Sequence, residues 1–252
     1  MSLKYARTIS IQILKATLLL LFIGIHLLTV AVPEPEKSNN TSNALPLTGI
    51  KELYQKLHCG NMSFEAFLMA WNGYQQLKAL NKLTVDSILT VVDFSKPSTS
   101  DRMFVINTNQ WKIVLQTLVA HGRNSGDLYA QKFSNIVSSY QSSLGTYVTG
   151  ATYQGKHGYS LTLNGMEKGI NDRAYERAIV IHGADYVNDK YISQYGRIGR
   201  SFGCPAVSYE ISKTIIDLIK NGSCMFLYHP EYEKLNGLAM IGVGNAMAHL
   251  AH

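Results

Sequence analysis

Six short runs rich in β-branched and aromatic residues occupy the middle of the chain and restrict it to a mainly β fold. Such residues favour extended backbone because their side chains pack well on a pleated surface. Turn-forming Asn, Gly and Ser separate the runs, and regular alternation with helices is missing. The sequence therefore predicts an antiparallel meander or a β-sandwich. The runs cover residues 88–92, 103–106, 111–119, 146–149, 159–163 and 178–182, and a last strand is expected at 225–229.

Two helical regions are expected beside the strands. Between residues 49 and 79 the apolar residues fall at helical spacing, and Ser63 is a suitable N-cap within this segment. A second helix is predicted to begin after Ser208, to carry its apolar residues on one face, and to end at Asn221-Gly222. The prediction is a mainly β domain with an N-terminal helical segment and one late helix.

The N-terminus has the order of charges that is typical of secretion. Three basic residues precede an uncharged apolar run at 16–32, which is followed by a polar, Pro- and Asn-rich stretch at 33–48. This run is near the lower length limit of a membrane-spanning helix, so a cleaved signal peptide and an uncleaved anchor through residues 16–32 both stay open. Either one predicts export to the periplasm or the cell envelope.

The sequence thus divides into five predicted segments. They are a signal peptide or anchor at 1–32, a linker at 33–48, a helical prelude at 49–95, a catalytic domain at 96–230 and a tail at 231–252.

The net charge is weak evidence for a nucleic-acid partner. The chain has 23 Lys and Arg against 17 Asp and Glu, a formal charge of +6. Three of the basic residues lie in the leader, which leaves 20 against 17, and these are scattered along the chain. Because nucleic-acid binding needs a clustered basic face, no such partner is expected.

Three cysteines, Cys59, Cys204 and Cys224, are an odd number for an exported chain. At least one thiol is left over, and an unpaired thiol outside the cytoplasm either risks oxidation or has a chemical role. If any bridge forms, we expect it to join Cys59 and Cys224.

Two reactive side chains lie at expected structural boundaries. His182 ends an apolar run, and Cys204 stands between Gly203 and a proline just before the late helix. An imidazole can accept the proton of a thiol, and the N–H groups of Gly203 and Cys204 could stabilise the oxyanion of an attacked carbonyl. The orienting partner of the imidazole would be a backbone carbonyl near Gly183 or a hydroxyl.

Two other interpretations of these residues remain at this point. A buried Cys and a His at the end of a strand are often packing residues. A zinc site could combine His182 and Cys204 with His229 or His157, but the chain has no short ligand pair such as C-x-x-C, and no metal or other cofactor is expected.

The segment 178–207 contains IHGADYV and GRIGRSFGCPAV, with 22 positions from His182 to Cys204. It closely resembles the murein L,D-transpeptidase catalytic domain family, a branch of the YkuD-like enzymes. Upstream stretches such as TVVDFSKPSTSDRMFVIN, TLVAHGRNSG and KHGYSL follow in the same order, so the resemblance covers about 64–228. It departs from the broader YkuD-like pattern at Phe202, where His is usual, and at Pro205-Ala206.

The resemblance implies a mostly β domain in which the cysteine of S-x-G-C, here Cys204, attacks an L,D-peptide carbonyl with the help of His182. The substrates would be peptidoglycan stem peptides, which carry several carboxylates. Guanidinium groups bind carboxylates through a bidentate fork, so Arg200 and Arg173 are candidate substrate contacts, with Arg177 and Arg197 as further candidates. Contacts with substrate are also expected from Ser201, Gly183 and His157, and His121 is a weaker candidate for the cleft.

The sequence therefore predicts an exported cysteine acyltransferase that exchanges or crosslinks stem peptides through a Cys204 thioester. Water as acceptor would make it an L,D-carboxypeptidase, and an inactive wall-binding scaffold is a further alternative. A papain-like wall endopeptidase normally has Cys before His, the reverse of the order here.

Overall fold

The computed structural model describes residues 45–236. The predicted leader, nearly all of the linker and the tail from residue 237 lie outside the described residues. Within 45–236, no helix combines the length and the apolar character needed to cross a bilayer.

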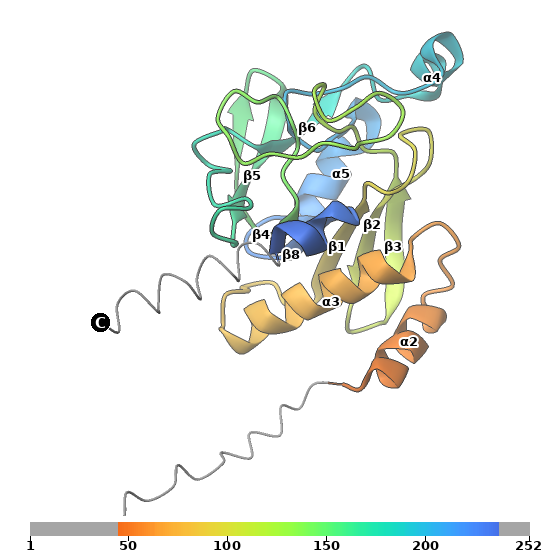
Figure 1. Cartoon of the computed structure of the whole chain (residues 1–252), viewed down its shortest axis with the longest axis vertical. Coiled ribbons are helices and arrows are strands. Elements are labelled where there is room, and N and C mark those ends of the chain that lie inside the picture. The colour runs from red at the N-terminus through yellow and green to blue at the C-terminus, as the bar shows by residue number, and fades with distance from the viewer. Residues whose placement is uncertain (1–44, 237–252) are drawn as a thin grey trace, which may run out of the picture. The chain divides into compact units, whose positions relative to one another are not determined.

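The core of the protein is a single eight-stranded sheet that confirms the predicted mainly β fold (Figure 1). The strand order is β3-β2-β1-β8-β4-β5-β6-β7. Most neighbours run antiparallel, whereas β1 with β8 and β6 with β7 are parallel. The strands are β1 (Ile88–Asp93), β2 (Met103–Asn107), β3 (Lys112–Thr117), β4 (Gly145–Gly155), β5 (Gly158–Gly165), β6 (Val180–Ala184), β7 (Ala206–Ser208) and β8 (Cys224–Tyr228).

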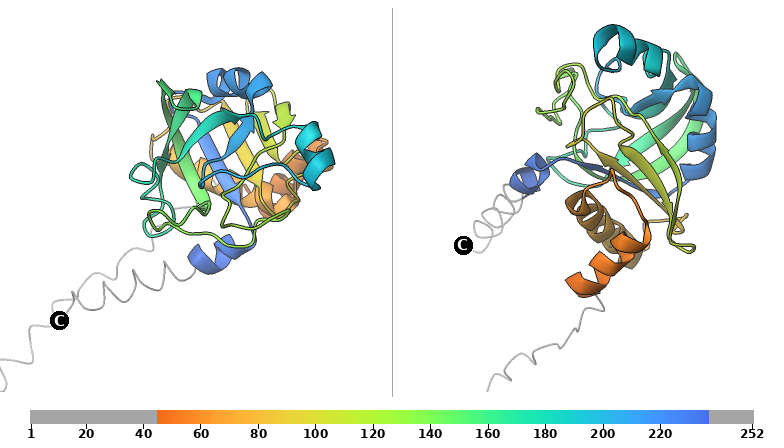
Figure 2. Two further views of the ribbon diagram at one scale, coloured as in Figure 1. Left: turned by 90° about the horizontal axis from the view of Figure 1, so that it is seen from above. Right: turned by 90° about the vertical axis from the view of Figure 1, so that its right-hand side faces the viewer.

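The two edges of the sheet come together near the start of β7. After β3, the chain pairs with the opposite edge through the bridges Ala120 to Ala206 and Gly122 to Ser201. The view from above in Figure 2 shows the strands curving round toward each other. The sheet is therefore nearly closed, and the segment at 120–123 lies directly beside the residues that precede β7.

Helical residues at 231–236 end the described part of the chain, and within 45–230 four helices lie around this sheet, two of which cover its faces. They are α2 (Leu47–Lys56), α3 (Phe64–Ala79), α4 (Asp189–Tyr195) and α5 (Tyr209–Ile219). The α3 helix packs over β1 and β8, and α5 packs over β6. The predicted N-cap Ser63 accepts the N–H of Ala66, which confirms the start of α3.

Several element boundaries differ from those expected from sequence. The first two residues of α2 belong to the segment predicted as a linker, and a break separates α2 from α3. The α4 helix and the three-residue β7 were not predicted, and β4 runs on to Gly155 to form a hairpin with β5. β1, inside the predicted prelude at 49–95, pairs with β2 and β8, so the sheet uses both predicted segments.

Candidate active site

Cys204 lies on the turn that leads into β7, and hydrogen bonds hold the backbone of this turn. Ser201 Oγ donates to the carbonyl of Cys204 at 2.6 Å and accepts the N–H of Gly203 at 3.0 Å. Ser142 Oγ donates to the carbonyl of Gly203 at 3.2 Å. Ser201, predicted to contact substrate, is buried, and both functions of its hydroxyl are used inside the turn.

Gly203 has the backbone conformation that this turn requires. Its φ is +124°, and a Cβ there would lie 2.8 Å from the carbonyl oxygen of Gln141. Its N–H is directed to Ser201 Oγ, whereas the N–H of Cys204 has no backbone or side-chain partner among residues 45–236. Of the two oxyanion donors expected from sequence, the Cys204 N–H is the one without a partner on another described residue, and the oxyanion role of both N–H groups stays a prediction.

The thiol of Cys204 is only partly exposed and is protonated at rest. The Sγ–H donates to the carbonyl of Ala178 at 3.6 Å. Burial raises the pKa of the Cys204 thiol, although the N–H of Val180 and the guanidinium of Arg177 favour the thiolate. A base is therefore needed to produce the nucleophile.

His182 lies in the middle of β6 and not at the end of a strand as predicted, because β6 continues to Ala184. It pairs with Ser160 of β5 and with Ala206 of β7, two residues after Cys204. The parallel pairing of β6 with β7 thus brings His182 close to the turn at 201–205. We call this segment the nucleophile turn, because it carries the predicted nucleophile Cys204.

The ring of His182 is oriented by the carbonyl of Gly183. Nδ1 lies 2.9 Å from this oxygen, and since a carbonyl can only accept, Nδ1 carries the proton. Nε2 is then left as the acceptor. Burial lowers the pKa of His182, and a positive charge on His157 would lower it further. The imidazole is therefore neutral and able to accept the thiol proton, as a general base must.

His157 covers one face of His182. The two rings stack with centroids 4.4 Å apart and planes at 24°. His157 comes from the turn between β4 and β5, and it lines the same cavity as His182 and Cys204. Its predicted place beside the cleft is thus observed.

One cavity of about 630 Å³ contains both predicted catalytic side chains. Its volume is in the range of small-molecule sites. The segment at 137–140, the β4–β5 turn, the start of β6 and the nucleophile turn form its walls. The side chains that line it are Val137, Ser138, Tyr140, Tyr153, Lys156, His157, Glu176, Arg177, Ala178, Val180, His182, Tyr186, Arg200, Ser201, Phe202 and Cys204.

Gly183, predicted to contact substrate, faces the helix instead. A Cβ on Gly183 would lie 2.4 Å from the ring of Tyr209 and 2.9 Å from Ser212 Oγ, both on α5. Successive residues of a strand point to opposite faces, so the face that directs His182 into the cavity directs Gly183 to α5. Its contribution to the site is its carbonyl, which is the orienting group expected for His182.

Arg200 lines the cavity as predicted, but its guanidinium already has an acidic partner. Nη1 donates to Asp127 Oδ1 at 2.6 Å and to the carbonyl of Gly126 at 2.9 Å. Arg197 lies nearby, with Nε 3.7 Å from the same Asp127 oxygen. Asp127 is exposed, so solvent competes for this contact.

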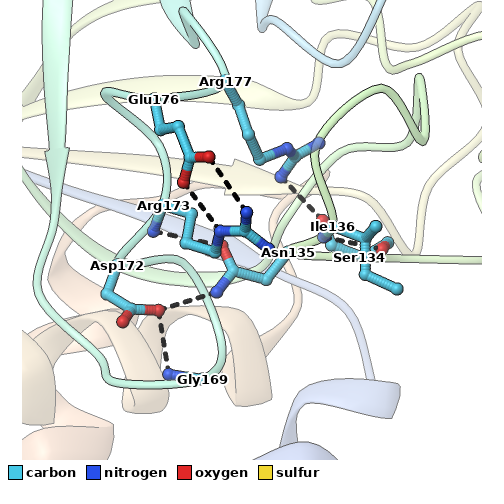
Figure 3. A network of polar contacts seen from close by, with 8 residues as sticks. All are labelled: Ser134, Asn135, Ile136, Gly169, Asp172, Arg173, Glu176 and Arg177. Atoms are coloured by element: carbon cyan, nitrogen blue, oxygen red, sulfur yellow. Dashed lines mark hydrogen bonds and ion pairs between the residues drawn. The ribbon is translucent and has the colours of Figure 1, made fainter.

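Arg173 is not among the residues that line the cavity, whereas Arg177 is. Figure 3 shows the polar contacts of both side chains. A contact of Arg173 with substrate stays a prediction. Arg173 forms a bidentate pair with Glu176, at 2.8 and 3.0 Å. Arg177 donates to the carbonyl of Ser134 at 2.7 Å and to Ser143 Oγ at 3.0 Å. Arg177 thereby links the segment at 134–143 to the residues just before β6, the strand that contains His182.

His121 lies outside the cavity and is buried. Nδ1 accepts from Nη2 of Arg102 at 2.8 Å, and Nε2 then donates to the carbonyl of Gly126 at 3.2 Å. Burial, reinforced by Arg102, lowers the pKa of His121 to about 3. His121 is therefore a neutral structural residue.

All three cysteines are free thiols, with Cys224 buried in β8. No bridge joins Cys59 and Cys224 in this structure, and Cys204 is free, as expected. Among residues 45–236, no three His, Cys, Asp or Glu side chains are grouped so as to hold a metal ion.

Comparison with known proteins decides the family. The profile of the L,D-transpeptidase catalytic domain matches residues 59–228. The chain belongs to this family. The match includes the nucleophile turn, β6 and the β4–β5 hairpin, so every residue that lines the cavity lies inside the family domain.

Two solved structures illustrate how distant the other similarities are. An L,D-transpeptidase from Mycobacterium smegmatis is 12% identical, with 57% of this chain and 59% of that chain covered and a TM-score of 0.35. An L,D-transpeptidase from Xylanimonas cellulosilytica is 13% identical, with 71% and 93% covered and a TM-score of 0.32. This chain thus spans less than two thirds of the first of these proteins. The comparison with curated proteins gave no match.

Several residues of the L,D-transpeptidase cavity could not be found from sequence. Ser138 and Tyr140 lie in a segment without regular structure, and both have positive φ, 59° and 56°. Their segment has neither helical nor strand periodicity, so nothing in the sequence directs it to the nucleophile. Tyr153 and Tyr186 offered no chemical signal in the sequence.

The pH dependence of acylation should reflect the low pKa of His182. Lowering this pKa keeps the imidazole unprotonated in more acidic solution, so the acid limb of kcat/KM should lie below pH 6.5, the ordinary value for histidine. His157→Phe keeps a stacked ring but removes the charge, and should move the limb to higher pH. His58→Gln, outside the cavity, is the control. An unmoved limb in His157→Phe would show that His157 does not affect the base.

Proposed function

We propose that this chain is an exported cysteine L,D-transpeptidase that acts on peptidoglycan stem peptides through a thioester on Cys204. The observation that carries this proposal is the arrangement of His182. Its Nδ1 hydrogen is committed to the Gly183 carbonyl, so Nε2 is a hydrogen-bond acceptor in the cavity that Cys204 also lines. This is the arrangement that a cysteine nucleophile requires.

In the acylation step, the thiol proton passes to Nε2 of His182 and sulfur attacks the carbonyl carbon of the L,D-peptide bond. The Cys204 N–H, free of other partners among the described residues, would donate to the oxyanion. The C–N bond then breaks, and the leaving amine takes the proton from His182. A thioester remains on Cys204.

In the second step, an amine attacks the thioester and gives a proton to Nε2 of His182. The C–S bond then breaks, and the departing sulfur takes this proton from His182, which restores the Cys204 thiol. With water as acceptor the product is a free carboxylate, and the protein acts as a carboxypeptidase. The apolar and aromatic side chains of Val137, Tyr140 and Phe202 line the cavity and offer contacts to a peptidic amine acceptor, which is the outcome we propose.

Export and membrane attachment are part of the proposal and rest on the sequence of the leader. The charge order before residue 33 supports secretion to the periplasm or cell envelope, with residues 16–32 as signal peptide or anchor. Mature peptidoglycan lies outside the cytoplasmic membrane, so the proposed substrate and the proposed location agree.

Intact-mass spectrometry tests the chemistry. Incubation with a stem tetrapeptide should add the tripeptide acyl group to the protein with release of the terminal D-amino acid, and a carbapenem should also acylate Cys204. Adding an amine acceptor should then produce a peptide carrying the acceptor, whereas release of free tripeptide would assign carboxypeptidase activity. Absence of an adduct with both acyl donors would favour a wall-binding scaffold.

A further inference from the structure

A second cavity of about 380 Å³ lies next to the catalytic cavity. We call it the loop cavity, because it is formed by residues 123–129, Gln131 and Lys132 together with Arg200. Arg123 and Arg200 relate it to the active site. Arg200 lines both cavities, and the guanidinium of Arg123 lies over the rings of Tyr140 and Phe202, at 4.5 and 4.7 Å.

The loop cavity carries an excess of positive charge. Three cations line it, Arg123, Lys132 and Arg200, against the single carboxylate of Asp127. Asp127 pairs with Arg200, whereas Arg123 and Lys132 form no ion pair with any described residue. Both of these free cations belong to exposed residues. An anionic group could therefore reach them without breaking an existing salt bridge.

The backbone of the loop is held in one conformation. The N–H groups of Gln131 and Lys132 both donate to the carbonyl of Ser125, at 2.8 and 3.0 Å. Gly126 has a φ of +153°, and a Cβ there would lie 2.0 Å from the carbonyl oxygen of Tyr129. The Gly126 carbonyl accepts from Arg200 and from buried His121. The loop cavity is thus built before any ligand arrives, which reduces the entropy lost on binding.

The ion pair between Arg200 and Asp127 can be replaced by an ion pair between Arg200 and a substrate carboxylate. Asp127 is 79% exposed, and an ion pair with such a partner contributes little stability. A substrate carboxylate can take the place of Asp127 on Arg200 while Arg123 or Lys132 holds its second oxygen. A guanidinium fork favours a carboxylate for this position because it can donate two parallel hydrogen bonds.

We propose that the loop cavity is a carboxylate subsite, which holds a carboxylate of a stem peptide whose reacting group lies at Cys204. The inference rests on the proposed function for the identity of the peptide. The carboxylate can belong to the acyl donor or to the acceptor, since both stems carry such groups. In either case the loop cavity fixes the position of the peptide and selects acidic over amidated stems.

Binding to Cys204→Ala, measured by calorimetry, tests the subsite without turnover. The probes are a stem tetrapeptide and the same peptide with its carboxylates converted to carboxamides. The parent should prefer the acid. Lys132→Gln should weaken binding of the acid about 2- to 5-fold, the double change Arg123→Gln and Lys132→Gln about tenfold, and binding of the amide should hardly change. Asp127→Asn should strengthen binding of the acid. Lys82→Gln, exposed and far from both cavities in sequence, is the matched control.

The proposal is wrong if the ratio of the affinities for the acid and the amide peptide is the same in the parent, in Lys132→Gln and in the double variant. Equal binding of both peptides by the parent would also contradict it. Repeating the measurement with an amine acceptor peptide in place of the tetrapeptide donor shows whether the variants weaken binding of the donor or of the acceptor. The peptide that loses affinity is the one whose carboxylate occupies the loop cavity. Failure of the proposed function is a separate result, because it appears as the absence of an acyl adduct on wild-type Cys204 and not in these ratios.

Discussion

Cys204→Ala is expected to abolish acyl-enzyme formation, and His182→Ala to slow it by about 10²- to 10⁴-fold. The first change removes the sulfur atom that forms the proposed thioester. The second leaves the thiol in place but removes the acceptor for its proton. Because burial raises the pKa of Cys204, the fraction of thiolate at neutral pH is small, and the residual rate of His182→Ala depends on this fraction.

The residual rate supplies a second test of the same pair. In His182→Ala, acylation should rise with pH as the thiol ionises, whereas in the wild type it should be nearly flat above the acid limb. Time-resolved mass spectrometry with a stem tetrapeptide measures both. Both variants should remain folded by circular dichroism. An adduct in Cys204→Ala would place the nucleophile elsewhere, and a wild-type rate in His182→Ala would remove His182 from the mechanism.

The sequence predicted the elements that are set by local patterns. The strands from β1 to β6 and β8 follow runs of β-branched and aromatic residues, and α5 follows the spacing of its apolar face. The parallel pairing of β1 with β8 joins residues more than 130 positions apart, and no local pattern specifies it. The three residues of β7 are too few to produce a periodicity.

The candidate pair could be predicted from sequence, but the surroundings of each side chain could not. Cys204 and His182 were predicted from their types, their positions and the family resemblance, and the parallel pairing of β6 with β7 places both beside one cavity. Arg173 and Arg177 look equivalent in sequence, yet one pairs with Glu176 at the surface and the other lines the cavity. This difference depends on where the segment at 134–143 folds, which only the structure shows.

Arg102→Leu is expected to lower the free energy of unfolding by about 3–5 kcal/mol. Arg102 is completely buried, and burial lowers its pKa to about 9, which leaves it charged at neutral pH. Its guanidinium donates to the carbonyls of Val119 and Lys96 and to Nδ1 of His121. Leucine would leave these three acceptors buried without a donor, and lysine cannot reach all three. Urea denaturation measures the loss, with Lys82→Leu, at an exposed position, as the control.

His121 gives this network a dependence on pH that can be followed separately. Its pKa is about 3 in the folded protein, against about 6.5 when unfolded. Between these values the unfolded chain binds the extra proton, so stability falls as the pH decreases through this window, by up to about 1.4 kcal/mol for each pH unit. His121→Gln should flatten this slope.

Since the residues beside His121 pair with the nucleophile turn, Arg102→Leu should also slow acylation. A variant with unchanged stability and unchanged slope would show that the buried network does not support the site.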